Sequence, residues 1–554
     1  MTATEVRPLA NATTVGDLLA KQVRDQPHAE ALVFPDRRVT YAELDERVAD
    51  IRVRLAQLGV GPGDRVGILL PGSVDLLATL FATTRLGAIA VPVNSRFKNV
   101  ELAQIVRHSG MKVLCTSAES MPLINSALPD IIDADKLPTE QTPELEAIVL
   151  LGQESPRGRN YVVLADIAVT SDTQELARNL EASARVRDCC LLVYTSGTTA
   201  APKGAQLSHE ALTRAAFGIC ARLAYTPQDR VWTPIPLFHG GGITFALSAV
   251  AGGVPFVHPG FFDPSTALET LQDERITVAL PAFETIWLPV LNRPDFPSFD
   301  LSSIRVVMAV GVEERLRAMQ EAMPAAKYVS CVAMTESAAF LTLSKLTDTD
   351  LKTRSTGGHP MPGMLCRILD IATGAELGPG QQGELVFRGP TMFDGYFRDP
   401  ELTAEKIDAE GWYRSGDVVI ADEDGRITFL SRIKDMLKIG GENVAAAEVE
   451  DFLIRHPAVE LVAVVSAPDA RYVEVPAAYV QLKLGAEVTE AELIDYCIGQ
   501  IATFRVPRYV RFIAHRDDWP MSGTKIKKVV LREMIADELK RLGITEAPKL
   551  VLPR

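Results

Sequence analysis

The sequence of 554 residues lacks the features that mark several classes of protein. Its seven cysteines form no CxxC pair and no metal-binding spacing, so neither a disulfide framework nor a zinc module is expected. The formal net charge of -14 disfavours broad binding to nucleic acids or anionic membranes. No apolar run approaches the roughly 18 residues that span a bilayer, and no basic segment followed by an apolar one marks a signal peptide. We therefore expect a soluble cytoplasmic protein with no nucleic-acid partner and no integral membrane segment.

Short apolar runs alternate with helical patterns over much of the chain. The run "RVGILL" (65–70) is followed by apolar residues at helical spacing and then by "AIAVPV" (88–93). This alternation is typical of mainly parallel sheets covered by helices. Beyond about residue 355 the patterns become those of antiparallel strands. An Asp-Gly turn in "DEDGRITFL" (422–430) predicts a hairpin there, so a smaller β subdomain is expected.

The last part of the chain has the pattern of a separate α+β domain. Two strand patterns, a helix expected over 489–502 and a basic helix expected over 525–542 follow the stretch "SRIKDMLKIGGENV" (431–444). A unit of about 120 residues is an ordinary domain size. The predicted fold class is therefore α/β, with a large N-terminal domain and β subdomain over 1–432 and a small α+β domain over 433–554.

A polar loop follows the apolar run "CCLLVY" (189–194) and reads "TSGTTAAPKG" (195–204). Its small residues would let backbone N–H groups approach an anion, while its hydroxyls and lysine would add further donors. A Walker-type loop is excluded, because Pro202 and Gly204 stand where that motif requires glycine and Ser or Thr. From this stretch alone, an ordinary turn without a ligand is an equal alternative.

Further polar stretches follow this loop along the chain. They are "PLFHGGGI" (236–243), "MTES" (334–337), "GELVFRGPTMFDGYF" (383–397), "GWYRSGD" (411–417), "SRIKDMLKIGGENV" (431–444) and "PMSGTKIKK" (520–528). In this order and spacing they resemble the core motifs of the adenylate-forming superfamily, which includes acyl-CoA synthetases, luciferases and peptide-synthetase adenylation domains. The resemblance covers nearly the whole chain and is strongest to bacterial fatty-acyl-CoA ligases.

The resemblance implies a two-step reaction that uses ATP, Mg²⁺ and coenzyme A. A carboxylic acid and Mg-ATP would form an acyl-adenylate and pyrophosphate, and the acyl group would then pass to a second nucleophile. The matching residues are Thr195, Ser196, Gly197, Thr198, Thr199 and Lys203 for the β- and γ-phosphates, Thr335 for the α-phosphate, Glu336 for Mg²⁺, and Asp417 with Arg432 for the ribose. Lys525 matches a mobile lysine that bridges the carboxylate and the α-phosphate during adenylation.

The residue chemistry agrees with these roles. A hard cation with oxygen ligands suits Glu336, and a compact ammonium on a flexible stem suits the transient contact of Lys525. Each residue also has an ordinary alternative when it is considered alone. Glu336 could cap a helix, Asp417 could be a turn residue, and Lys525 could lie on a solvated helix face.

Four more positions take roles from the same resemblance. His239 matches a residue that gates the acyl or thiol path, with a packed core histidine as the alternative. Lys434 matches the hinge about which the mobile C-terminal domain rotates, with an ordinary surface lysine as the alternative. Gly440 and Gly441 lack a Cβ and would let the pantetheine arm of coenzyme A lie close to the backbone.

The chain departs from the family pattern only at positions without a catalytic charge. A glycine, an aromatic-glycine pair, a tyrosine-proline pair and a second glycine are replaced; the replacing residues are Ala200, Val332, Ala333, Ala445, Ala446 and Thr524. We therefore expect the packing of adenine and the loop geometry to differ, but not the class of reaction.

The acid is expected to be hydrophobic: fatty, branched, aryl or alicyclic. Amino-acid-activating relatives carry an aspartate in the stretch that here reads "LFHGGGIT" (237–244), so a free α-amino acid is not expected. Apolar surfaces favour such an acid by burying its area, and the candidate lining residues are Phe245, Phe283, Trp287, Met308, Val310 and Met334. Core packing is the alternative for several of them, because strands of parallel sheets are apolar on both faces.

The expected function is that of an AMP-forming acyl-CoA ligase. Coenzyme A is favoured as acceptor, because no carrier domain is fused and no inserted segment is present of the kind that locks fatty acid–AMP ligases in the adenylating state. Two alternatives stay open: transfer to a carrier protein or an amine after the same first step, and a catalytically silent nucleotide-binding protein. Retention of Glu336, Asp417 and Lys525 argues against the silent protein. A homodimer is compatible with the sequence.

Overall fold

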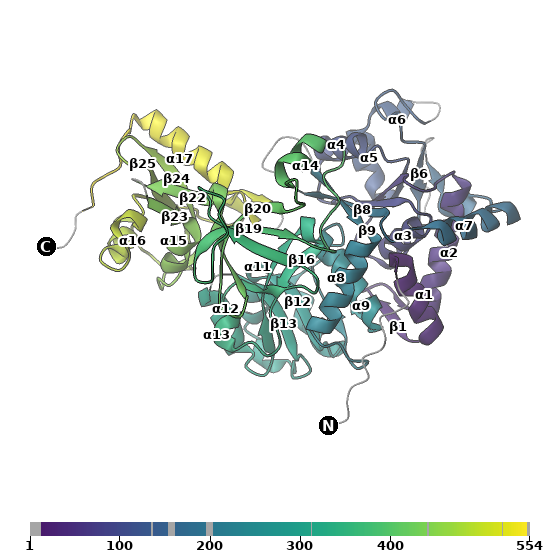
Figure 1. The fold of residues 1–554 in the computed structure, drawn as a ribbon, viewed down its shortest axis with the longest axis horizontal. Coiled ribbons are helices and arrows are strands. Elements are labelled where there is room, and N and C mark those ends of the chain that lie inside the picture. Colours follow the sequence, from purple (N-terminus) through teal and green to yellow (C-terminus); the bar gives the residue numbers. More distant parts are fainter. Residues whose placement is uncertain are drawn as a thin grey trace.

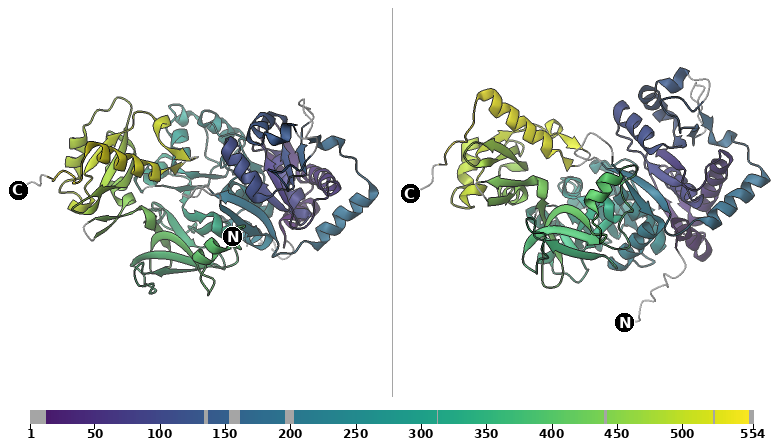
Figure 2. Two further views of the ribbon diagram at one scale, coloured as in Figure 1. Left: turned by 90° about the horizontal axis from the view of Figure 1, so that it is seen from above. Right: turned by 45° about the horizontal axis from the view of Figure 1, so that its top comes forward.

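Five β-sheets organise the part of the chain that the structure describes. The structure is a computed structural model, and it describes residues 13–133, 137–152, 161–195, 203–311, 313–439, 442–522 and 525–550. A large N-terminal part contains three of the sheets, and a smaller C-terminal lobe lies at one end of the molecule (Figures 1 and 2).

The first parallel sheet has the strand order β7-β6-β5-β3-β4-β8-β9, and only the β8–β9 pair is antiparallel. Its strands are β3 (Arg65–Leu69), β4 (Ile89–Pro92), β5 (Val113–Thr116), β6 (Ala147–Leu150), β7 (Val162–Val163), β8 (Cys189–Thr195) and β9 (Lys203–Ser208). Helix α2 (Tyr41–Gln57) precedes β3, and the helices between the strands are α3 (Val74–Arg85), α4 (Asn99–Ser109), α5 (Met121–Ala127), α6 (Asp130–Asp133) and α7 (Ser171–Ser183).

The second parallel sheet has the order β14-β13-β12-β10-β11-β1-β2, with β1 and β2 as its antiparallel pair. Its strands are β1 (Glu30–Val33), β2 (Arg38–Thr40), β10 (Val231–Trp232), β11 (Phe256–Val257), β12 (Val278–Phe283), β13 (Val306–Val310) and β14 (Lys327–Val329). The accompanying helices are α1 (Val15–Asp25), α8 (His209–Arg222), α9 (Gly240–Gly252), α10 (Pro264–Asp273), α11 (Glu284–Leu291) and α12 (Glu313–Ala322).

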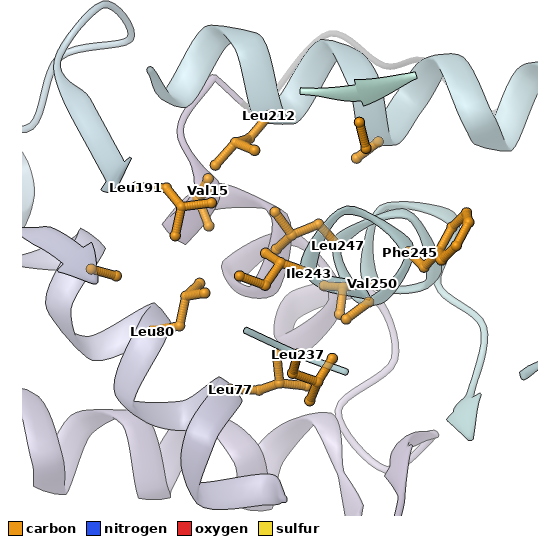
Figure 3. Packing of buried hydrophobic residues seen from close by; sticks show 14 of the residues in the cluster. Val15, Leu77, Leu80, Leu191, Leu212, Leu237, Ile243, Phe245, Leu247 and Val250 are labelled. Atoms are coloured by element: carbon orange, nitrogen blue, oxygen red, sulfur yellow. The ribbon is translucent and has the colours of Figure 1, made fainter. Parts of the chain in front are cut away.

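Residues of both parallel sheets and of the helices between them form one large hydrophobic core. Figure 3 shows Ile243, Leu247 and Val250 of α9 facing side chains of α1, α3 and α8. Helix α9 is apolar on all sides, as expected of a helix buried among others. It begins directly after His239 and is capped at its C-terminal end by Gly253, whose φ of 69° is the left-handed conformation that glycine tolerates. Burial of α9 therefore fixes the position of the polar stretch that precedes it.

An antiparallel sheet follows, with the order β15-β16-β17-β21-β20-β19-β18. Its strands are β15 (Cys331–Met334), β16 (Ala339–Leu343), β17 (Gly357–Pro360), β18 (Leu365–Leu369), β19 (Gln382–Arg388), β20 (Tyr413–Ala421) and β21 (Ile427–Arg432), and its helices are α13 (Asp350–Thr353) and α14 (Pro400–Lys406). The predicted Asp-Gly hairpin joins β20 to β21, with Gly425 at a φ of 73°. The predicted change from parallel to antiparallel strands is confirmed, but it occurs at β15, which begins at Cys331, and not near residue 355.

The C-terminal lobe has a five-stranded sheet covered by helices. Its strands are β22 (Met436–Ile439), β23 (Glu442–Ala445), β24 (Val459–Asp469), β25 (Val473–Leu482) and β26 (Tyr509–Phe512), and its helices are α15 (Ala446–Leu453), α16 (Glu490–Cys497) and α17 (Lys528–Leu542). A separate hairpin contains β27 (Met521–Ser522) and β28 (Lys525–Ile526). The predicted α/β class with a C-terminal α+β lobe is confirmed.

Two predicted helices of this lobe have wrong bounds. Helix α16 ends at Cys497 rather than 502, because Ile498 is extended and Gly499 has a φ of 77°. Helix α17 starts at Lys528 rather than 525, because the backbone of Lys525 and Ile526 pairs with β27 and the Lys527 N–H donates to the Pro520 carbonyl at 2.7 Å. Lys525 therefore lies in a hairpin strand and not on a helix.

Candidate active site

The sequence-predicted residues lie mostly at the ends of strands. Thr335 and Glu336 form the short 3₁₀ turn η4 (Thr335–Ser337) directly after β15, and both are half-buried. Thr335 approaches Gly240, since a Cβ on that glycine would lie 4.0 Å from the Thr335 Cγ2 atom. The structure thus brings the "FHGGG" stretch beside the "TES" stretch, although almost a hundred residues separate them in the sequence.

The Glu336 side chain is held by tyrosines. The Tyr396 hydroxyl donates to Glu336 Oε1 at 2.6 Å and lies 3.1 Å from the Tyr413 hydroxyl. Burial, together with the negative charge of Glu336, raises the pKa of both tyrosines far above the ordinary value. Both hydroxyls therefore stay protonated at neutral pH and remain available as donors.

The backbone of Glu336 is held by the chain segment that carries Tyr396. The Phe393 N–H donates to the Glu336 carbonyl at 2.9 Å. The Phe393 ring packs edge-on against Tyr396 and Tyr413, with ring centroids 4.9 Å and 5.3 Å away. The glutamate is thus held through both its main chain and its side chain.

The segment that carries Tyr396 also pairs with β9, the strand that follows the predicted phosphate loop. Gln206 N–H donates to Gly395 O at 3.1 Å, Asp394 N–H to Gln206 O at 2.9 Å, and Phe397 N–H to Gly204 O at 2.8 Å. Lys203 is half-buried at the start of β9, where its backbone pairs with that of Thr195. Ser196, Gly197, Thr198 and Thr199 lie outside the described residues.

Asp417 and Arg432 pair as the sequence analysis anticipates. They stand opposite each other in the register of β20 and β21, and Arg432 Nε lies 2.5 Å from Asp417 Oδ1. The Asp417 side chain is only 2% exposed, whereas that of Arg432 is 41% exposed. The Asp417 N–H donates to the Ser415 hydroxyl oxygen at 3.0 Å. The carboxylate is thus buried and fixed, and the arginine reaches solvent.

The other predicted residues are distributed as follows. His239 is exposed and occupies the N-cap position of α9. Lys434 is the middle residue of the 3₁₀ turn η5 (Ile433–Asp435), between β21 and the C-terminal lobe. Lys525 begins β28, and Gly440 and Gly441 lie outside the described residues.

The six acid-pocket candidates differ in burial. Phe245, Trp287 and Met308 are almost completely buried in hydrophobic cores, and the Trp287 Nε1–H donates to the Tyr328 hydroxyl at 3.0 Å. Phe283, Val310 and Met334 are only half-buried, and each stands at the carboxyl end of its strand. Phe283 and Val310 are direct neighbours in the register of β12 and β13. These three residues have the position that a substrate pocket at strand ends requires.

Tyr396 and Tyr413 are functional candidates that the sequence analysis missed. Both lie inside quoted motifs, "FDGYF" and "GWYRSGD", but nothing in those motifs indicates a partner. The Tyr396–Glu336 contact joins residues 60 positions apart, and only the fold reveals it. An open cavity of about 450 Å³ lies beside Tyr396 and is lined by Gln206, Asp394, Arg398 and Thr403 among others; none of the predicted site residues lines it.

The described residues fit a magnesium ion held largely by phosphate. No group of three or more His, Cys, Asp or Glu side chains within them converges as a metal site. Mg²⁺ in phosphate-transfer sites commonly takes one or two carboxylates and completes its shell with phosphate oxygens and water. The single fixed carboxylate of Glu336 is a donor set of this kind.

Comparison with known proteins agrees with this geometry. Residues 19–397 match the family model described as AMP-binding enzyme, and residues 448–523 match its C-terminal domain. The fold is that of an adenylate-forming enzyme. The chain belongs to the AMP-binding enzyme family.

The curated relatives are acyl-CoA synthetases and ligases. The putative acyl-CoA synthetase YngI of Bacillus subtilis is 34% identical over 94% of this chain and 97% of its own length. The mitochondrial medium-chain acyl-CoA ligase ACSF2 of Mus musculus is 30% identical over 95% of this chain and 88% of its own. These similarities support an AMP-forming acid–thiol ligase.

Solved structures of the fold include MatB from Rhodopseudomonas palustris. With ATP bound, it superposes with a TM-score of 0.79 at 26% identity, covering 94% of this chain and 99% of the other. The apo form, with the same identity and coverage, gives a TM-score of 0.71. Among the described helices of this protein, none combines the length and apolar character that crossing a bilayer requires.

Proposed function

We propose that the protein activates a hydrophobic carboxylic acid with Mg-ATP and transfers the acyl group to coenzyme A. The observation that carries the proposal is the pairing of β9 with the segment 394–397. This pairing joins the strand next to the phosphate loop to Glu336, through the hydroxyl of Tyr396. The acid, coenzyme A and ATP are the substrates, and Mg²⁺ is the cofactor.

In the first step, the like charges of carboxylate and triphosphate must be brought together. The hydroxyls and backbone of residues 195–199, with Lys203, would bind the β- and γ-phosphates, and Thr335 would donate to the α-phosphate. Glu336 would hold Mg²⁺, which neutralises phosphate charge when it is bound. Asp417 would accept from both ribose hydroxyls, with Arg432 beside it.

Both half-reactions are substitutions that balance without any further reactant. A carboxylate oxygen attacks the α-phosphorus, the bond to the β-phosphate oxygen breaks, and pyrophosphate leaves. The thiolate sulfur of coenzyme A then attacks the acyl carbon, the bond from that carbon to the phosphate oxygen breaks, and AMP leaves. Lys525 would stabilise the charge that develops in the first step.

We place the boundary between the two domains after Arg432, with Lys434 as the hinge. The turn η5 that contains Lys434 separates the last strand of the antiparallel sheet from the first strand of the C-terminal lobe. The higher TM-score with ATP-bound than with apo MatB supports a lobe arrangement close to that of the ATP-bound relative. Rotation would remove Lys525 and bring Gly440 and Gly441 to the pantetheine path.

The acid would lie against the half-buried ends of β12, β13 and β15, and exposed His239 would gate its path. Phe283, Val310 and Met334 make this region apolar, which favours a hydrophobic acid by area burial. All seven cysteines are free thiols, which supports the cytoplasm as the compartment. A homodimer stays a prediction.

Product analysis tests the proposal. The protein is incubated with Mg-ATP and a panel of medium-chain, branched, aryl and alicyclic acids, with and without coenzyme A, and nucleotides and thioesters are separated. We expect AMP, pyrophosphate and an acyl-CoA in equal amounts. ADP and phosphate would exclude the adenylate route. Acyl-AMP that coenzyme A does not consume would point to a carrier protein or an amine as acceptor.

A further inference from the structure

Glu336 is the acceptor at one end of a chain of two tyrosine hydroxyls. Tyr396 has a single hydroxyl hydrogen, and at 2.6 Å this hydrogen is donated to Glu336 Oε1. The Tyr413 hydroxyl lies 3.1 Å from that of Tyr396 and also within hydrogen-bonding reach of Glu336, so its own hydrogen is available to the Tyr396 oxygen and to the carboxylate. Hydrogen bonds in such a chain strengthen one another, and a bond to a charged acceptor is stronger than a neutral one.

The hydroxyl chain connects the three regions that are proposed to bind the nucleotide. Tyr396 belongs to the segment hydrogen-bonded to β9, which follows the phosphate loop. Glu336 lies in η4 beside Thr335, and Tyr413 begins β20, the strand that carries Asp417. A displacement of any one region would lengthen a bond in the chain. The distance between the proposed metal carboxylate and the ribose carboxylate is thus set by these hydroxyls as well as by the sheet.

We propose that Tyr396 is a positioning residue that fixes the Glu336 carboxylate for Mg²⁺, and that Tyr413 supports this position through its contacts with the Tyr396 hydroxyl and with Glu336. The inference rests on the proposed function, since it assigns the second layer of the same metal site. Groups that hydrogen-bond a metal ligand fix its orientation, and their loss commonly weakens metal binding or activity by about 10- to 100-fold.

The test measures magnesium dependence by binding instead of turnover. Wild-type protein and the Tyr396→Phe variant are titrated with α,β-methylene-ATP, which cannot release pyrophosphate, by calorimetry at a series of Mg²⁺ concentrations. We expect Tyr396→Phe to raise the Mg²⁺ concentration for half-maximal analogue binding about tenfold. Binding of AMP without metal should be unchanged. Tyr413→Phe should shift the Mg²⁺ dependence in the same direction by a smaller factor.

Tyr225→Phe is the matched control. It removes the hydroxyl of a half-buried tyrosine that follows α8 and lies 3.4 Å from Ser248 Oγ of α9, away from Glu336, and it should leave the Mg²⁺ dependence unchanged. An unchanged Mg²⁺ dependence in both Tyr396→Phe and Tyr413→Phe would overturn the inference, as would an equal loss of AMP binding, which would indicate a structural role. Wild-type protein that binds the analogue without any Mg²⁺ dependence would instead count against the proposed function.

Discussion

At the residue scale, burial divides the six apolar candidates for the acid pocket. Phe245, Trp287 and Met308 have no surface to offer a substrate, because each is at most 2% exposed. Phe283, Val310 and Met334 keep exposed surface at strand ends. The sequence does not separate the two groups, because all six residues lie in apolar runs and their burial depends on how the helices of Phe245 and Trp287 and the strands of the others pack.

Substitutions at Val310 and Trp287 should therefore have different effects. Val310→Phe adds bulk beside Phe283 and should lower kcat/KM for the longest accepted acid about tenfold or more, with little change for the shortest. Trp287→Phe removes the bond to Tyr328 and should lower the free energy of unfolding by about 1–3 kcal/mol, with the preference for acids unchanged. Activity profiles over an acid series and denaturant unfolding measure the two effects. An unchanged profile for Val310→Phe would place the acid elsewhere.

The limits of sequence reasoning are also visible at single residues. The opposed Asp417 and Arg432 could be anticipated, because both lie in motifs of the resemblance and the hairpin between them was recognisable. The contact between Glu336 and Tyr396 could not be anticipated, because it depends on where the segment 394–397, about 60 residues later in the chain, pairs with β9. Tertiary placement of this kind leaves no local pattern.

At the element scale, helix α15 of the C-terminal lobe faces acidic groups of the N-terminal part. Arg315 of α12 bonds Glu284 at 2.9 Å and also donates to the carbonyl of Glu460 in β24. Burial, together with the charges of Glu450, Glu284 and Glu313, raises the pKa of Asp451 in α15 to about 7, against the opposing charge of Arg455. The protonated, uncharged form of Asp451 is thus favoured where α15 faces these acidic side chains.

The stability should consequently fall as the pH rises. Because the pKa is about 7 in the fold against 3.8 ordinarily, the folded protein binds one proton more than the unfolded chain between these values, and stability is lost as the pH rises through that interval. Asp451→Asn should remove this dependence of stability on pH and should raise the free energy of unfolding by roughly 2 kcal/mol at pH 8. Denaturant unfolding at pH 5 and pH 8 measures it.

The exposed Asp517 supplies the control. Asp517→Asn should reproduce the wild-type dependence on pH. A wild-type dependence that persists unchanged in Asp451→Asn would show that other groups cause it.

Element types were more predictable than their ends. Alternating apolar runs indicated both parallel sheets, and the Asp-Gly turn indicated the hairpin of the antiparallel sheet. Helix α17 was predicted three residues too long, because the pairing of β28 with β27 competes with helical hydrogen bonds that the basic pattern alone favours.

At the scale of the whole molecule, the proposed reaction requires the two lobes to act in succession. Lys525 belongs to the C-terminal lobe, whereas Glu336 and Asp417 belong to the N-terminal part. A lysine that acts only in the first half-reaction must approach the N-terminal site and then withdraw. The turn η5 at Lys434 is the connection at which such a movement would occur.

Single-turnover measurement of the two half-reactions in Lys525→Ala tests this account most directly. Acyl-AMP formation is followed without coenzyme A, and thioester formation is followed from supplied acyl-AMP. Exposed Lys527→Ala, two residues away, is the control. We predict that Lys525→Ala slows acyl-AMP formation at least about a hundredfold and leaves thioester formation within a few-fold of wild type. Equal losses in both half-reactions, or equal effects of the two alanine variants, would contradict the account.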